Sequence, residues 1–199
     1  MNEPEPSPAP QGDEDDFSLM DRVKTGDMTA FETLVERHQH SVVGTVAKML
    51  GCANEAEDIA QMVFIRVWKS AARYEPSAKF TTWLMTITRN LVFNEMRRRQ
   101  RAHLIPMEGE NEESPAPQFA DADAPGPRDE LLKAEMQGAI DAAIASLPEN
   151  QRTAIILRRY ENMPYEEIAQ VLSTSVPAVK SILFRARAEL KEKLQQYLD

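Results

Sequence analysis

Two stretches rich in proline and acidic residues divide the chain, and they limit what the remainder can fold into. Of the 13 prolines, four lie in residues 4–10 and five in residues 106–127. The same stretches concentrate Glu, Asp, Ser and Ala, and such segments bury too little apolar surface to offset the entropy lost on folding. We therefore expect a disordered acidic tail at residues 1–16, a domain at residues 17–103, an acidic Pro-rich linker at residues 104–130, and a domain at residues 131–199.

Hydrophobic spacing in both domains predicts an all-α protein with two small helical domains joined by the disordered linker. Asp27 can cap a helix whose apolar residues recur at helical intervals as far as Met49, and Gly51 follows as a stop signal. A second helix is predicted from about Asn54, and a third opens at Thr81 after a loop. The sequence shows neither strand-like alternation nor an internal repeat. A length of 199 residues suits two domains of this size.

The net charge of −9 is unevenly distributed along the chain. Residues 1–16 contain six acidic residues and no Lys or Arg, and residues 104–130 contain eight acidic residues and one Arg. Residues 17–103 instead contain 13 basic and 9 acidic residues, whereas residues 131–199 contain nine of each. The basic excess of the first domain, rather than the acidic whole-chain balance, therefore decides whether that domain can approach a polyanion.

The single cysteine, Cys52, excludes a disulfide framework and favours a reducing compartment. We expect it to be a buried, small apolar side chain. The N-terminus lacks the basic-then-apolar order of a secretory signal, and no apolar run approaches the roughly 20 residues needed to cross a bilayer. The expectation is a soluble, cytoplasmic protein without membrane insertion.

The predicted helix after Phe80 has one stripe of residues suited to nucleic acid. Steps of seven, four, three and four residues separate Trp83, Asn90, Asn94, Arg97 and Arg101. An aromatic ring can stack on a base, asparagine can bind a base edge, and arginine can hold phosphate. The candidates for this surface are Lys79, Trp83, Arg89, Asn90, Asn94, Arg97, Arg98 and Arg101. The spacing alone leaves an alternative, a solvated basic helix end with a core tryptophan.

Near the C-terminus, a short helix, a polar turn and a basic helix match a helix-turn-helix. Pro164 can open the first helix, Ser175 can cap the second, and Pro177 is tolerated in its first turn. The residues expected to face inward are Val179, Leu183 and Ala186. The residues left to face a DNA groove are Ser175, Lys180, Ser181, Arg185 and Arg187. A plain helical hairpin with a cationic second helix is the alternative.

A third segment, residues 57–71, suits a protein partner. Asp58 and Gln61 lie three residues apart, and Phe64 and Trp68 continue that face. Large aromatic side chains beside polar groups are typical of protein interfaces. The spacing alone is equally compatible with two core aromatics, so both interpretations stay open here.

Together these stretches resemble the extracytoplasmic-function sigma factors of bacterial RNA polymerase. The resemblance covers nearly all of both domains and rests on GDMTAFETLVERH, AEDIAQMVFIRVWKSAARY, FTTWLMTITRNLVFNEMRRR, LPENQRTAIILRRYENMPYEEIAQVL and SVPAVKSILFRARAEL, in this order. It implies that the first domain, region two, recognises and melts the minus-ten promoter element. It also implies that the second domain, region four, binds the minus-thirty-five element in the major groove.

The same resemblance implies partners. Region two is expected to dock on the clamp helices of core RNA polymerase through Asp58, Gln61, Phe64 and Trp68, region four is expected to meet the polymerase flap, and promoter DNA is the shared ligand. The sequence leaves open whether an anti-sigma factor holds the protein.

Two positions depart from the family pattern. Members often have Gly in the helix-turn-helix turn, where this chain has Ser173, and we expect a turn that is slightly strained or differently shaped there. Members also often have Arg where Ile182 stands, which removes one basic side chain from the expected groove-facing set.

Two other function classes fit the sequence less well. An autonomous helix-turn-helix transcriptional regulator would use the second domain but would not explain the stripe after Phe80. An enzyme is disfavoured, because His38 and His40 are two residues apart on a helix and point to different sides. No phosphate-binding glycine loop is present. The sequence predicts no catalytic residue, no metal and no cofactor, and it assigns the chemistry to the polymerase.

Overall fold

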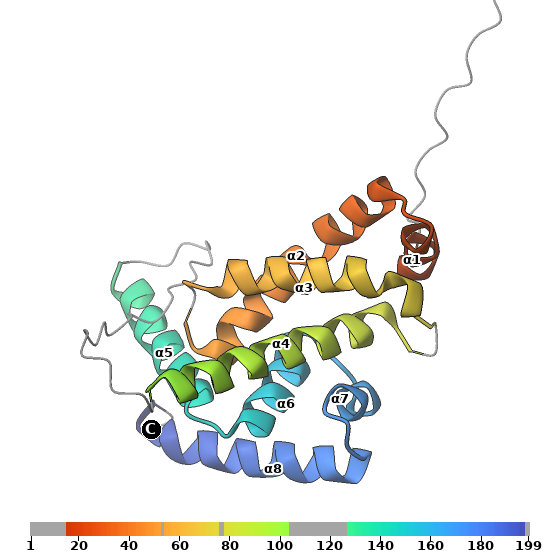
Figure 1. The fold of residues 1–199 in the computed structure, drawn as a ribbon. Coiled ribbons are helices and arrows are strands. Elements are labelled where there is room, and N and C mark those ends of the chain that lie inside the picture. The colour runs from red at the N-terminus through yellow and green to blue at the C-terminus, as the bar shows by residue number, and fades with distance from the viewer. Residues whose placement is uncertain (1–14, 53, 76–77, 104–126, 198–199) are drawn as a thin grey trace, which may run out of the picture.

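The computed structural model describes residues 15–52, 54–75, 78–103 and 127–197, and every regular element among them is helical. Figure 1 shows the helices of the first domain side by side, with the helices of the second domain packed along them and α8 at the outer edge. The predicted all-α class with two helical domains is confirmed. Within the described ranges, none of the helices has the length and hydrophobicity needed to traverse a bilayer.

The first domain begins as its sequence signals predict. Its elements are α1 (Asp16–Lys24), α2 (Met28–Leu50), α3 (Ala56–Ser70), the 3-10 turn η1 (Ala71–Arg73) and α4 (Phe80–His103). The Asp27 side chain caps α2 by accepting a hydrogen bond from the backbone of Ala30 at 3.1 Å. Gly51 ends α2 in the left-handed conformation with φ of 74°, which a residue without Cβ adopts readily.

Helix α1 lies partly in the stretch that the sequence assigned to the tail. Asp15 caps it by accepting from the backbone of Ser18 at 2.8 Å. Asp16 accepts hydrogen bonds from Arg37 at 2.6 Å and shares one with His38 at 2.9 Å. The folded domain therefore starts two residues earlier than predicted, because Asp15 provides a local cap and Asp16 has partners 21 and 22 residues away. The rest of the predicted tail, residues 1–14, lies outside the described residues.

The second domain is built from α5 (Pro127–Ala145), α6 (Glu149–Arg159), α7 (Tyr165–Val171), α8 (Val176–Lys193) and the 3-10 turn η2 (Gln195–Tyr197). Helix α5 begins inside the stretch predicted as linker, and residues 104–126 lie outside the described part. The predicted helix-turn-helix is α7 and α8: Pro164 precedes α7, and Ser175 caps α8 by accepting from the backbone of Ala178. The residues predicted to face inward are at most 1% exposed: Val179, Leu183 and Ala186.

The turn between α7 and α8 is strained at the predicted residue. Ser173 has φ of 52°, a left-handed conformation that costs an L-residue roughly 1–2 kcal/mol. The next residue, Thr174, donates its backbone N–H to the carbonyl of Ala169 at 2.9 Å, which closes the end of α7. The expectation drawn from the missing glycine is confirmed.

The two domains pack against each other. Helix α4 contacts α7, and α2 contacts α5 and α6 (Figure 1). Buried residues of both domains belong to one continuous apolar cluster, including Met49 from the first and Ile156 from the second. At Gly51, an added Cβ would lie 3.1 Å from the Cβ of Ala145, so the end of α2 approaches α5 closely. The described residues thus form a closed arrangement, in which the two domains share a core.

Candidate nucleic-acid and polymerase interfaces

The C-terminal half of α4 has an open polar stripe. Asn90, Asn94, Arg97 and Arg101 are all exposed. Their spacing puts them on one side of the helix. In the described part of the chain, neither arginine of this stripe has a carboxylate within ion-pair distance. The four side chains therefore offer two amides and two uncompensated cations in one row.

Trp83 lies at the other end of the stripe and is partly buried. Its ring centroid lies 5.0 Å from that of Tyr74 and 6.1 Å from that of Phe80. One side of the indole thus packs on the core while the remainder stays accessible, and the role of Trp83 in nucleic-acid binding stays a prediction. A substitution at Trp83 will therefore disturb stability as well as any surface function.

The other predicted arginines of α4 are not part of the open stripe. Arg98 forms two hydrogen bonds of 2.7 Å with the carboxylate of Glu95, which neutralises it locally. Arg89 is partly buried, and its guanidinium lies 4.4 Å from the centroid of the Phe93 ring. Burial lowers the pKa of Arg89, while the charge of Glu149 from the second domain opposes that shift. Arg89 is therefore withdrawn from the exposed row that contains Asn90.

Arg99, which the sequence analysis did not select as a site residue, contacts the loop after α2. It donates to Glu55 at 2.6 Å and to Glu95 at 3.1 Å, and its Nη1 lies 3.5 Å from the Sγ of Cys52. Cys52 is only partly buried. The expectation of a buried apolar cysteine is wrong, because the tertiary fold brings an arginine 47 positions away to the thiol.

Lys79, at the start of α4, has a partner in the other domain. Its Nζ lies 2.8 Å from Oε1 of Glu167 on α7. The hydroxyl of Thr82, one turn further on, donates to the same carboxylate at 3.1 Å. One candidate of the nucleic-acid surface is therefore engaged in the domain contact.

The second helix of the helix-turn-helix presents its predicted polar residues to solvent. All of the selected side chains are exposed: Ser175, Lys180, Ser181, Arg185 and Arg187. Phe184, which the sequence analysis missed, is 74% exposed on the same helix. Phe184 is adjacent to Arg185 and three residues from Arg187, and an exposed aromatic beside basic residues is a signal that periodicity arguments overlook. Ile182, the family departure, is partly buried against the core.

Helix α3 presents a different apolar surface from the one predicted. Asp58 and Gln61 are exposed, as expected. Phe64 is only 7% exposed, and Trp68 packs on Phe31 with centroids 5.0 Å apart. Both aromatics pack in the space between α2 and α3 rather than standing on an open face, and their role in polymerase docking stays a prediction. The exposed apolar residues of α3 are instead Met62, at 45%, and Ile65, at 52%.

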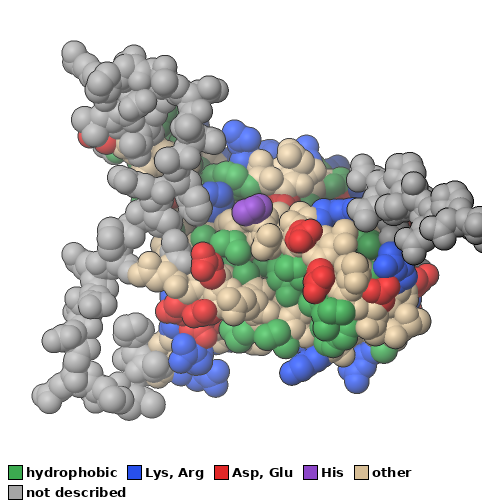
Figure 2. All heavy atoms as spheres, turned by 90° about the horizontal axis from the view of Figure 1, so that it is seen from above, with side chains coloured by type: hydrophobic (Ala, Val, Ile, Leu, Met, Phe, Trp, Pro, Cys, Tyr) green, Lys and Arg blue, Asp and Glu red, His purple; other side chains and the backbone are tan. Residues whose placement is uncertain are grey.

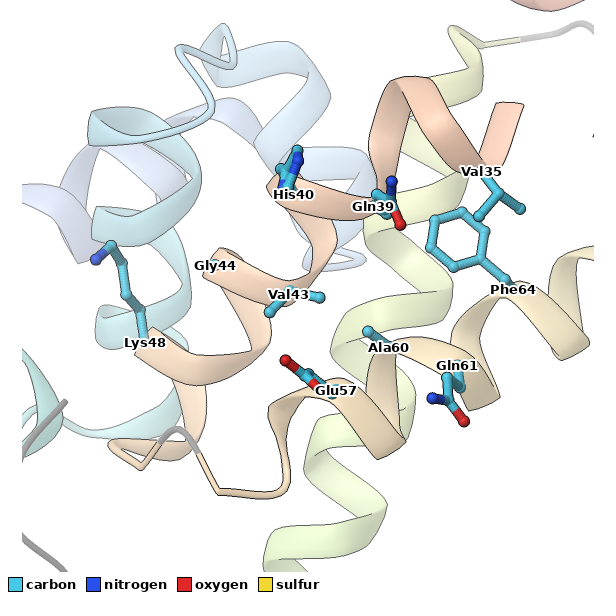
Figure 3. A pocket seen from close by; sticks show the side chains of 10 residues that line it. All are labelled: Val35, Gln39, His40, Val43, Gly44, Lys48, Glu57, Ala60, Gln61 and Phe64. Carbon is cyan, nitrogen blue, oxygen red and sulfur yellow. The ribbon is translucent and has the colours of Figure 1, made fainter. Parts of the chain in front are cut away.

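A groove runs between α2 and α3 beside this face. It has a volume of about 590 Å³. Figure 3 shows the Phe64 ring pointing across it toward Val35, with Gln61 and Glu57 along its α3 side and His40 on α2. Figure 2 shows the face formed by α2 and α3, where hydrophobic side chains lie among scattered acidic ones. The helix pair thus offers an apolar surface with a polar edge, which suits a protein partner.

The first-domain histidines have separate surroundings, as their spacing predicts. His38 shares a hydrogen bond with Asp16 and lies 5.2 Å from the Phe80 ring, whereas His40 lines the groove. Among the described residues, no three or more His, Cys, Asp or Glu side chains are grouped so that they could hold a metal ion.

Two family models match this chain. The model for sigma-70 region 2 matches residues 34–102, and the model for sigma-70 region 4 matches residues 137–190. The RNA polymerase sigma-H factor of Pseudomonas aeruginosa is 34% identical over 186 residues, covering 93% of this chain and 96% of that protein. The ECF RNA polymerase sigma-E factor of Escherichia coli strain K12 is 33% identical over 184 residues, covering 90% and 94%.

Two solved structures have the same fold. One is CnrH in complex with the cytosolic domain of CnrY, with a TM-score of 0.66, 24% identity, and coverage of 92% of this chain and 97% of that one. The other is the sigma factor RpoE in complex with the anti-sigma factor NepR from Bartonella quintana, with a TM-score of 0.63, 24% identity, and coverage of 83% and 96%. Both similarities extend over both domains of this chain.

Proposed function

The chain belongs to the extracytoplasmic-function group of sigma factors, which bind core RNA polymerase and direct promoter-specific transcription initiation, and we propose that its two domains use separate surfaces for the two promoter elements. The first surface is on α4, and the second is on α8. A third surface, on α3, docks on the polymerase. The alternative of an autonomous helix-turn-helix regulator is not favoured, since it leaves the region-two match without a role.

The minus-ten surface consists of Trp83, Asn90, Asn94, Arg97 and Arg101. Base edges of a melted strand are accessible to asparagine amides, and an aromatic ring provides a stacking platform at one end of the row. Phosphates of the same strand are held by the two arginines that have no carboxylate partner in the described structure. This open row on α4, next to an Arg98 neutralised by Glu95, is the observation that carries the proposal.

The minus-thirty-five surface is the exposed side of α8. Lys180 and Arg185 anchor the helix on phosphate or base edges, and Ser181 lies beside them. Ser175 holds the start of the helix through its cap and presents the N-terminal turn to DNA. Arg187 completes the predicted set.

The polymerase-docking surface is the outer face of α3. Asp58, Gln61, Met62 and Ile65 stand at positions i, i+3, i+4 and i+7 of α3 and are all exposed, so they share one side. Apolar side chains at the centre and polar ones at the edge are the usual composition of a protein interface. Phe64 and Trp68 lie behind this face, in the space between α2 and α3.

The proposal includes an anti-sigma factor as a further partner of this chain. It also places the chain in the cytoplasm. The Bartonella quintana sigma factor that shares this fold was solved with the anti-sigma factor NepR. The groove between α2 and α3 offers an apolar surface of the kind that a regulatory protein would bind.

Transcription with purified core polymerase tests the proposed function. The chain should bind promoter duplex with sequence preference only in the presence of core, and transcripts should start at fixed positions downstream of the two elements. Equal sequence-specific binding of the duplex without core would instead favour the autonomous regulator.

A further inference from the structure

Three cations share one side of α3 and of the 3-10 turn that continues it. Arg66, Lys69 and Arg73 stand at positions i, i+3 and i+7 of this segment, and all three are exposed. A helix rises 1.5 Å per residue, so the three positions span about 10 Å along the axis. We call these three residues the α3 cation row.

Several other cations of the first domain have carboxylate partners, and this row has none in the described part of the chain. Carboxylate oxygens lie 2.6–2.8 Å from the following residues: Arg22, Lys24, Arg37, Arg98 and Arg99. No carboxylate of the described residues lies within ion-pair distance of Arg66, Lys69 or Arg73. The row therefore offers three positive charges in a line to an acidic partner.

The start of α1 lies next to this row. Figure 1 shows α1 beside the C-terminal end of α3, and α1 contacts η1. The ring centroid of Phe17 lies 6.5 Å from that of Tyr74, the residue that follows Arg73. Burial raises the pKa of the Tyr74 hydroxyl, and the negative charge of Asp16 raises it further. The chain segment that precedes α1 is therefore joined to the fold close to one end of the row.

That segment, residues 1–14, carries charge of the opposite sign. It lies outside the described residues and contains four prolines and no Lys or Arg. Its four acidic residues are Glu3, Glu5, Asp13 and Glu14. A chain of this length extends to at most about 46 Å, several times the span of the row. Reach and charge thus suit the segment to the three cations.

The covalent connection strengthens a contact whose single ion pairs are weak. One exposed ion pair contributes little, because water and salt screen it. A segment joined to its site by a short flexible chain is present there at a millimolar effective concentration, and several pairs then form together. A free polyanion must displace the segment before it binds the row.

We propose that residues 1–14 bind the α3 cation row in the free chain and keep other polyanions off it. The contact is intramolecular and needs neither polymerase nor promoter, so it goes beyond the proposed function. It gives a role to an acidic segment that the DNA and polymerase surfaces leave unused.

Zero-length cross-linking of the 199-residue chain tests the contact directly. A carbodiimide joins a lysine amine to a carboxylate that touches it, and Lys69 is the reporter because no carboxylate of the described residues lies within ion-pair distance of it. Mass spectrometry of the digested monomer should identify an amide between Lys69 and a carboxylate of residues 1–14. If no such link formed, the proposal would be overturned.

Two variants show whether the link depends on the row. Arg66→Gln/Arg73→Gln keeps the reporter lysine and should lower the yield of the link roughly threefold or more, because two of the three attracting charges are gone. Lys191→Gln/Lys193→Gln removes two positive charges from exposed positions of α8 and should leave the yield unchanged. Equal losses in the two variants would contradict docking on the row. Circular dichroism verifies the helix content of each variant.

Competition by a second polyanion tests the consequence. The probe is a fluorescent oligothymidine of about 20 nucleotides, which carries phosphates but no promoter sequence. Glu3→Gln/Glu5→Gln/Asp13→Asn/Glu14→Gln should bind it roughly threefold to tenfold more tightly than the wild type at about 50 mM salt, and the difference should fade at about 0.5 M salt. With Arg66→Gln/Arg73→Gln present, the same four substitutions should bring no gain.

The matched control removes four negative charges at exposed positions elsewhere: Glu32→Gln/Glu36→Gln/Glu166→Gln/Glu192→Gln. Its gain in affinity should stay below about twofold, since only long-range, screened repulsion is removed. An equal gain in the control would show that net charge alone sets the affinity. Oligothymidine binding at the row that ignores the charge of residues 1–14 would make the row a nucleic-acid site only. Either result would overturn the proposal, and neither measurement depends on whether the proposed function holds.

Discussion

The indole of Trp68 packs against the ring of Phe31 across the α2–α3 contact, with their centroids 5.0 Å apart. Phe64 lies on the same inner side and is 7% exposed. These aromatics therefore hold α3 in place, and the exposed apolar residues of α3 are Met62 and Ile65, to which we assign the proposed docking surface.

Ile65→Ala and Met62→Ala should each weaken the binding of core polymerase roughly tenfold, because truncating an exposed apolar residue at the centre of an interface costs more than about 1 kcal/mol. Fluorescence titration of labelled core measures this. Met136→Ala is the matched control, since Met136 is 44% exposed against 45% for Met62 but lies on α5.

Phe64→Ala distinguishes a supporting residue from a contact residue. It should lower the free energy of unfolding by about 3–5 kcal/mol, the usual cost of a large-to-small change in a core. If Ile65→Ala lowered stability by a comparable amount without affecting core binding, the assignment of the outer face of α3 as the docking surface would be wrong.

Asn90→Ala should impair promoter opening while leaving core binding unchanged. The loss of one good amide contact to a base edge costs about 1–3 kcal/mol. Permanganate footprinting of the holoenzyme on promoter DNA measures the melted region. Gln100→Ala is the control, since Gln100 is exposed on a different side of α4. If the Asn90→Ala holoenzyme gave a melted region of normal intensity, Asn90 would have no role in promoter opening.

Lys180→Ala and Arg185→Ala should weaken binding of the minus-thirty-five element. A lost phosphate contact lowers affinity across all sequences and reduces the salt dependence by about one unit of slope, whereas a lost base contact relaxes preference at one position. Holoenzyme binding measured over a range of salt concentrations separates the two. Lys191→Ala, on the distal part of the same helix, should bind DNA as the wild type does. If Lys191→Ala lost the same affinity, the weaker binding would result from the change in net charge and not from a lost contact.

Ser173→Gly should stabilise the second domain. The residue has φ of 52°, and glycine adopts this conformation without the cost that a Cβ imposes. After the greater chain entropy of glycine is deducted, the gain should be about 0.5–1 kcal/mol in the free energy of unfolding, measured by urea denaturation. Ser173→Ala keeps the Cβ and should bring no gain, so equal stabilisation by alanine would refute the strain argument.

Local signals predicted most of the helices and much of the candidate site. Asp27 and Gly51 marked the ends of α2, and Ser175 marked the start of α8, because capping depends on residues close in sequence. The stripe on α4 followed from helical spacing alone, and its exposed members are as predicted.

Contacts between distant residues account for what the sequence did not predict. The partners of Asp16 lie 21 and 22 positions away, and Arg99 lies 47 positions from Cys52. The outer face of α3 was assigned to aromatics because periodicity shows which residues share a side but not which side meets the core. The pairing of Glu161 with Ser41, across 120 positions, has no local signal at all.

The central claim, that α4 and α8 act on separate promoter elements, is tested most directly by transcription from a promoter library with both elements randomised. Core polymerase is supplied with the wild-type chain, with Asn90→Ala or with Arg185→Ala, and the transcribed promoters are sequenced. Asn90→Ala should relax base preference in the minus-ten element alone, and Arg185→Ala should change recognition of the minus-thirty-five element alone. Relaxed preference in the opposite element, or unchanged preference in both, would contradict the assignment.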